Sequence, residues 1–87
     1  MHSTITNIRQ LGSAIRARRR ETSLTTTQVA SMARVSRRLL TEIETGKRPN
    51  VAFSAVVRIL DVLGLDLEVG RRGLPGTRAG DRVPEDV

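Results

Sequence analysis

Apolar residues recur at helical spacing along four stretches of the chain, which predicts four helices. The predicted ranges are 7–22, about 26–33, about 37–44 and about 52–63. In the first of them, Ile8, Leu11 and Ile15 fall along one stripe, as the buried face of an amphipathic helix requires. The fourth is apolar nearly all round, so we expect it to be buried on more than one side.

Polar residues and glycines mark the ends of these helices. Asn7, Thr25 and Ser36 precede the first three, and their short oxygen-bearing side chains are favoured N-caps. Gly46 and Gly64 follow the third and fourth, where glycine commonly ends a helix. The second and third helices are therefore short and separated by only a few residues.

The five residues after the fourth helix, LDLEV at 65–69, alternate between apolar and acidic side chains. A period of two predicts a half-buried strand. One strand is not stable alone in water. It therefore pairs either with residues 3–6 of the same chain, STIT, or with its own copy across a two-fold axis. From residue 71 onward glycine, proline and arginine dominate without an apolar period, so residues 71–87 are predicted to be a disordered tail.

The composition narrows the kind of protein. The 87 residues are enough for one small domain, and with one Phe and no Trp or Tyr the core must be aliphatic. Cysteine is absent, which excludes disulfides and thiolate metal sites, and the single histidine, His2, stands beside the start. We expect no enzymatic activity, no cofactor and no metal. No apolar run reaches the ~20 residues of a membrane span, and no signal peptide is evident, so we expect a cytoplasmic protein without membrane contact.

The net charge of +6 is unevenly distributed. Residues 1–64 carry 11 basic and 4 acidic side chains, a balance of +7, whereas residues 65–87 carry 4 and 5, a balance of −1. A basic folded region points to nucleic acid or an anionic membrane surface. The competing interpretation is a compositional bias, because 14 of the 15 basic residues are arginine.

Two short helices joined by a tight turn form a helix-turn-helix, and over residues 11–69 the chain resembles the lambda-repressor/Cro-like (XRE-type) family. The matching stretches are LGSAIRARRRETSLTTTQVA, ARVS and LLTEIETGKRP. Ala30 stands where the second and third helices must approach closely, and Val35, Leu40 and Ile43 occupy the usual core positions. The ending KRPNVAFSAVVRILDVLGLDLEV, a long helix running into one strand, resembles the HipB-type antitoxin branch.

This resemblance implies a mainly α fold, a lambda-repressor-like bundle of four to five helices with one short C-terminal strand pairing across a dimer. Residues 1–70 would form the DNA-binding and dimerisation domain. The implied function is a sequence-specific repressor, the antitoxin of a HipA/HipB-like operon that regulates its own promoter. The alternatives are a stand-alone XRE regulator or a protein-interaction module with a vestigial DNA surface.

The partners expected from the resemblance are a palindromic double-stranded operator, a second copy of the chain and a HipA-like kinase toxin. A helix-turn-helix needs a dimer to read two half-sites, which favours pairing of the strand across the two-fold axis. The residues expected in the dimer interface are Val62, Leu65, Leu67 and Val69.

In the family, the outer positions of the third helix point into the major groove. Arg37 and Arg38 can bind guanine O6 and N7 or grip phosphate. Glu42 can accept a hydrogen bond from cytosine N4, or it can pair with Arg38 one turn away, and both interpretations stay open. The full candidate DNA-binding set is Thr26, Thr27, Arg34, Ser36, Arg37, Arg38, Thr41, Glu42, Thr45, Lys47 and Arg48.

Two charged residues are assigned a structural role. Arg19 continues the apolar stripe of the first helix, and Glu44 follows Leu40 by four residues, so both lean inward. A buried charge needs a partner, which predicts an Arg19–Glu44 ion pair, and the resemblance implies the same pair.

The chain departs from the family pattern at two positions. Thr26 stands where the family usually has a glutamine that binds phosphate, and a hydroxyl is shorter. Arg34 stands where the turn usually has glycine at positive φ. A non-glycine residue with positive φ is strained by ~1 kcal/mol or somewhat more. Either the turn geometry differs, or Arg34 is kept because it contacts phosphate.

Overall fold

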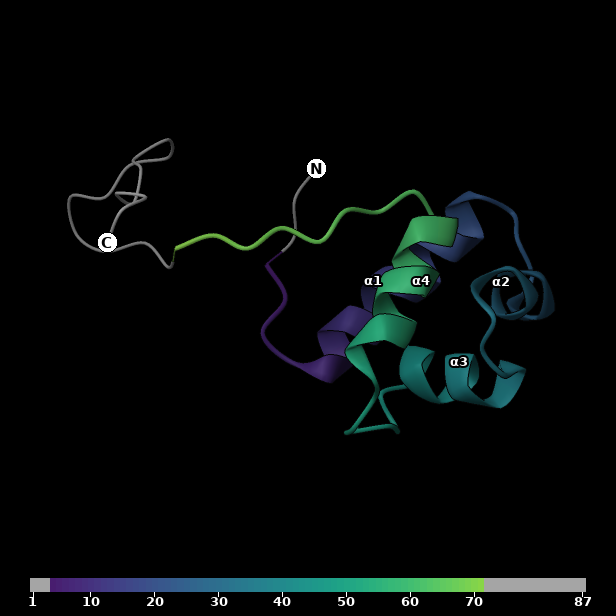
Figure 1. The fold of residues 1–87 in the computed structure, drawn as a ribbon, viewed down its shortest axis with the longest axis horizontal. Coiled ribbons are helices and arrows are strands. Elements are labelled where there is room, and N and C mark those ends of the chain that lie inside the picture. Colours follow the sequence, from purple (N-terminus) through teal and green to yellow (C-terminus); the bar gives the residue numbers. More distant parts are fainter. Residues whose placement is uncertain (1–3, 72–87) are drawn as a thin grey trace.

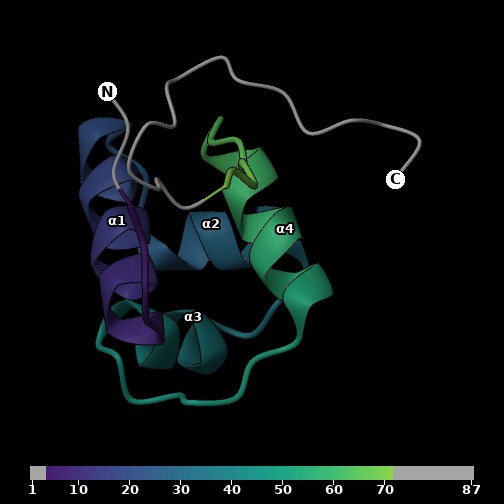
Figure 2. The ribbon, with the colours of Figure 1, turned by 90° about the vertical axis from the view of Figure 1, so that its left-hand side faces the viewer.

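The computed structural model describes residues 4–71, and this part of the chain forms four helices and no strand. The helices are α1 (Ile8–Glu21), α2 (Thr26–Ala33), α3 (Arg37–Glu44) and α4 (Phe53–Val62). Figure 2 shows α1 and α4 on opposite sides, with α2 between them and α3 closing one end. The predicted mainly α helix-turn-helix bundle is confirmed, and every predicted helix end lies within one residue of the observed one.

The predicted N-caps are confirmed. The side chains of Asn7, Thr25 and Ser36 each accept the backbone N–H three residues ahead, at 2.8, 3.1 and 2.9 Å. At α2 the Gln28 side chain also accepts from the Thr25 backbone N–H at 2.9 Å, which completes a capping box. Only α4, which begins after Ala52, has no side-chain cap among these four helices. The first turn of α4 is therefore stabilised by packing and not by a capping side chain.

The core is built from aliphatic side chains alone. Its buried members are Ile15, Val29, Ala30, Ala33, Leu40, Ile43, Val56, Ile59, Leu60 and Leu63. The prediction that α4 is buried on more than one side holds only in part, because Phe53 at its start is 67% exposed. In the single chain one side of α4 is therefore buried fully, while its outer face is left partly open.

A glycine allows the close approach of α1 and α3. A Cβ atom built on Gly12 would lie 1.9 Å from the carbonyl oxygen of Ile43 and 3.2 Å from the Cα atom of Glu44. No other residue fits there without moving backbone, because both contacts are to the main chain of α3. Gly12 thus sets how close α3 lies to the rest of the bundle.

Two arginines bind helix C-termini across the bundle. Arg18 of α1 donates from Nε to the carbonyl oxygen of Leu63 at 2.9 Å. Arg58 of α4 donates from Nε to the carbonyl oxygen of Ala33, the last residue of α2, at 2.9 Å. A cation at a helix C-terminus satisfies free carbonyls and interacts favourably with the helix dipole. The two bonds fasten α4 to both α1 and α2.

Beyond Gly64 the chain runs away from the helices as an extended segment (Figure 1). Leu65 is half-buried against the core, whereas Leu67 and Val69 are 51% and 95% exposed. Within residues 4–71 no strand pairs the segment 65–69 with the chain's own N-terminus. A strand across a dimer needs a second copy, so that pairing stays a prediction. The predicted tail lies, from residue 72 on, outside the described residues.

None of the four helices combines the length and the apolar character that crossing a bilayer would require.

Candidate nucleic-acid interface

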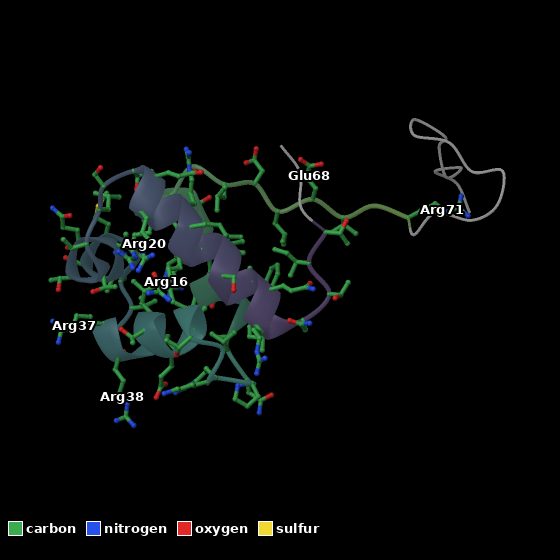
Figure 3. All side chains as sticks on the ribbon, turned by 180° about the vertical axis from the view of Figure 1, so that it is seen from behind. Arg16, Arg20, Arg37, Arg38, Glu68 and Arg71 are labelled. Atoms are coloured by element: carbon green, nitrogen blue, oxygen red, sulfur yellow. The ribbon has the colours of Figure 1, made fainter. Side chains whose placement is uncertain are left out.

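The outer face of α3 is open to solvent while its inner face is anchored in the core. Leu40 and Ile43 are fully buried, whereas Arg37, Arg38 and Thr41 are exposed. Figure 3 shows Arg37 and Arg38 extending outward from the start of this helix. The helix therefore presents two guanidinium groups on a rigid element, as a groove-binding helix needs.

The turn between α2 and α3 passes through Arg34 in the left-handed conformation, with φ 59° and ψ 43°. The following N–H, of Val35, bonds to the carbonyl oxygen of Ala30 at 3.0 Å and closes the turn. The first alternative from the sequence, a changed turn geometry, is therefore wrong. The glycine-type geometry is retained, and Arg34 bears its strain of about 1 kcal/mol. Its exposed side chain is available to a partner.

Arg19 and Glu44 meet in a two-bond ion pair between α1 and the end of α3. Arg19 Nε lies 2.7 Å from Glu44 Oε2, and Arg19 Nη2 lies 2.9 Å from Glu44 Oε1. The side chains are 13% and 4% exposed. Arg19 also donates to the carbonyl oxygen of Leu24 at 3.1 Å. The hydrogen bond to Glu44 raises the pKa of Arg19, so the guanidinium stays charged and holds α3 in place.

Glu42 lies between two arginines. Its Oε2 is 3.3 Å from Arg38 Nε, one turn earlier on α3, and its Oε1 is 3.0 Å from Arg48 Nη1, in the loop after α3. The hydrogen bond from Arg48, and after it that from Arg38, lowers the pKa of Glu42, so the carboxylate is ionised at neutral pH. The pair with Arg38 was one of the two interpretations from the sequence. The contact with Arg48 was not predicted.

The loop after α3 is held to the helix by its backbone. The Lys47 N–H donates to the carbonyl oxygen of Glu42 at 2.9 Å, and the Thr45 hydroxyl donates to the carbonyl oxygen of Thr41 at 2.9 Å. Gly46 makes this possible with its φ of +72°. The Lys47 side chain is exposed just beyond the C-terminal end of α3.

The remaining predicted DNA-binding residues lie at the starts of α2 and α3. Thr26 and Thr27 form the first turn of α2, where Thr26 is half-buried and Thr27 is exposed. Ser36 is exposed, and its hydroxyl oxygen caps α3. Ser36 directly precedes Arg37, the first residue of α3, whereas Thr26 and Thr27 belong to α2. The predicted set therefore occupies α2, the turn, α3 and the following loop, and none of it comes from α1 or α4.

Two of the predicted dimer residues, Leu65 and Leu67, line an apolar groove formed with α1 and α4. The groove has a volume of about 380 Å³, and Ile5, Leu11, Leu60, Leu65 and Leu67 contribute its apolar lining. Among the predicted interface residues, Val62 and Leu65 are half-buried, and Leu67 and Val69 are exposed. Residues 4–71 contain no group of three acidic, histidine or cysteine side chains that could hold a metal ion.

The family model described as "Helix-turn-helix domain" matches residues 10–74 of the chain. No curated protein matches this chain. Among solved structures, the clp gene regulator ClgR from Corynebacterium glutamicum is 27% identical, with a TM-score of 0.64 over 72% of this chain. The match covers 66% of the ClgR chain, so this chain spans just under two thirds of its length.

Two solved complexes of HipB are also similar. The "HipB-O4 20mer complex" matches with 18% identity and a TM-score of 0.74, and the "HipA-HipB-O2-O3 complex" with 19% identity and a TM-score of 0.73. Each match covers 83% of this chain and 100% of the other. At these identities the likeness to HipB shows a shared fold.

Proposed function

The chain belongs to the helix-turn-helix domain family as a DNA-binding regulator of XRE type, and on this basis we propose that it is a dimeric, sequence-specific repressor. The observation that carries the proposal is the outer face of α3, where Arg37 and Arg38 extend into solvent above a fully buried inner face. Such a regulator works beside the chromosome, in the cytoplasm.

In this proposal α3 enters the major groove and the segments around it hold the DNA backbone. The guanidinium of Arg37 or Arg38 can donate two hydrogen bonds to guanine O6 and N7. Arg34, Thr27 and Lys47 flank α3 and would contact phosphates, which position the helix without reading sequence. The shorter Thr26 weakens the phosphate contact that the family makes with glutamine.

Replacing Arg37 tests this assignment. Arg37→Ala should weaken binding to a preferred site by roughly 5- to 150-fold, the worth of about 1–3 kcal/mol for one arginine–guanine contact. Arg71→Ala removes the same charge at the far end of the molecule (Figure 3) and should change that preference little. The measurement is competition binding of a selected site against random DNA. Equal losses for both DNAs would make Arg37 a phosphate contact, and a wild-type protein that binds no DNA would refute the proposed function.

Dimerisation would place two copies of α3 on two half-sites. The exposed Leu67 and Val69 support a second copy as partner of the 65–69 segment, because their apolar surface is uncovered in the single chain. Pairing with the second copy would also satisfy the backbone groups of the extended segment.

The dimer can be tested without disturbing the fold of one copy. The double change Leu67→Glu and Val69→Glu should leave each copy folded, since both side chains are exposed, but should abolish the dimer and weaken operator binding. Met32→Glu alters another exposed apolar residue, 60% exposed on α2, and serves as the control. Sedimentation equilibrium gives the answer. If the double variant remains dimeric, the dimer interface lies on α4 and not on the 65–69 segment.

Two biological settings have support. The likeness in fold to HipB, over its full length and including a complex with HipA, supports an antitoxin that binds a HipA-like kinase toxin and represses its own operon. The 27% identity to ClgR supports a stand-alone regulator. Purifying the chain after expression from its native operon separates them, because only an antitoxin should carry a larger kinase with it.

A further inference from the structure

We propose that Glu42 sets the specificity of DNA binding through the two arginines it holds, by competing with DNA phosphates for Arg38 and Arg48. In this role it is a positioning residue that contacts no base. The inference rests on the proposed DNA-binding function and names how that same surface is regulated. It assigns base reading on α3 first to Arg37, which makes no ion pair within residues 4–71.

The geometry joins helix and loop through one carboxylate. Each carboxylate oxygen of Glu42 accepts a hydrogen bond from a different arginine. Oε2 accepts from Arg38 on α3, and Oε1 accepts from Arg48 in the loop after α3. Arg48 is held at its other side by the carbonyl oxygen of Asn50, 3.3 Å from its Nε. The Glu42 side chain is 25% exposed, whereas that of Arg38 is 87% exposed. The carboxylate therefore lies deeper in the surface than the Arg38 guanidinium. The Arg48 side chain is 48% exposed, so both guanidinium groups remain within reach of a phosphate.

Competition follows from the charges. A free guanidinium is attracted to any DNA phosphate, whatever the sequence, and this attraction supplies most non-specific binding. When Arg38 or Arg48 already has a carboxylate, binding a phosphate exchanges one ion pair for another, and the net gain is small. Base contacts are not weakened in the same way if they come from Arg37. Glu42 therefore lowers affinity for random DNA more than affinity for the matched site.

Direct base reading by Glu42 fits the contacts less well. A cytosine amino group would have to displace or share one of two guanidinium donors. The guanidinium donors carry a positive charge that also attracts the carboxylate, and the neutral amino group of cytosine lacks this charge. The carboxylate is therefore better placed to orient its arginines than to accept from a base.

The test compares two carboxylates with the same charge but different places. Glu42→Gln removes the charge between Arg38 and Arg48, whereas Glu21→Gln removes a charge that pairs with Arg18 on α1, at 3.4 Å and away from α3. We expect Glu42→Gln to bind random DNA roughly five-fold more tightly, the effect of one unit charge at contact distance in water. The slope of log affinity against log salt should steepen by about 0.9 to 1.8, for one or two additional phosphate contacts. The selected consensus sequence should not change.

Removing one arginine tests whether the effect passes through it. In an Arg48→Ala background, the gain from Glu42→Gln should shrink, because only Arg38 is left to release. Melting curves check that each variant is folded.

Three outcomes overturn the inference while leaving the proposed function intact. They are equal effects of Glu42→Gln and Glu21→Gln, a consensus altered at one base pair by Glu42→Gln, and an undiminished effect in the Arg48→Ala background. Failure of the wild-type protein to prefer any sequence would instead refute the proposed function.

Discussion

Gly12→Ala is expected to destabilise the protein by about 3 kcal/mol or more, although alanine is the better helix former by about 1 kcal/mol. The added methyl group would lie 1.9 Å from the carbonyl oxygen of Ile43 and 2.9 Å from its carbonyl carbon. These atoms belong to the backbone of α3 and cannot rotate away as a side-chain end could. The two helices must separate, and the Arg19–Glu44 pair beside the contact would be strained with them.

Thermal unfolding measures this effect. In a domain of this size about 1 kcal/mol shifts the midpoint by roughly 4–8 °C, so Gly12→Ala should melt at least about 12 °C lower. Ser13→Ala is the matched control, because Ser13 is exposed on the same turn of α1 and its replacement should change the midpoint little. A higher melting temperature for Gly12→Ala would show that α1 and α3 do not approach as closely as described.

Glu44→Ala should cost about 3–5 kcal/mol, because it leaves the Arg19 guanidinium buried without its anion. The Glu44 side chain is 4% exposed and accepts two hydrogen bonds from Arg19, so water cannot readily replace it. Total stabilities of about 5–15 kcal/mol are usual, which makes this loss a large share. Because the pair also fixes the end of α3, DNA binding should weaken with the fold.

Two further variants test whether the loss in Glu44→Ala comes from leaving a buried charge unpaired. Glu21→Ala breaks the Arg18–Glu21 pair, whose side chains are 40% and 64% exposed, and should cost little, since exposed pairs contribute at most about 1 kcal/mol. The double change Arg19→Met and Glu44→Leu should recover most of the stability lost in Glu44→Ala, because no unpaired charge is left. Denaturant unfolding gives all three free energies. An unchanged midpoint for Glu44→Ala would show that the pair contributes nothing to the free energy of unfolding.

Local features of the chain were predictable because their causes lie within a few residues. Asn7, Thr25 and Ser36 cap the helices that follow them, as their side chains and spacing predicted. The left-handed turn at Arg34 was one of two alternatives, because the family pattern has positive φ there whereas arginine rarely takes it, and the structure decided between them.

The candidate site was predictable only in part. Glu42 and Arg38 are one turn apart on a single helix, so their pairing could be expected. The contact of Glu42 with Arg48 could not, because it crosses the turn at Gly46 and depends on how the loop folds back. Pairings of this kind depend on backbone conformation outside regular secondary structure, where periodicity gives no signal.

The sequence by itself determined the four helices, their caps and the inward lean of Arg19 and Glu44, because helical periodicity and capping are local properties. Only the tertiary structure decided which surfaces come together. The contact of Gly12 with Ile43 joins positions 31 residues apart, and the bond from Arg18 to Leu63 spans 45. The residue type alone does not identify the partner, since both glycine and arginine occur within helices in many different structural contexts. Their roles follow from the distances between packed backbones, which are set by the whole core at once.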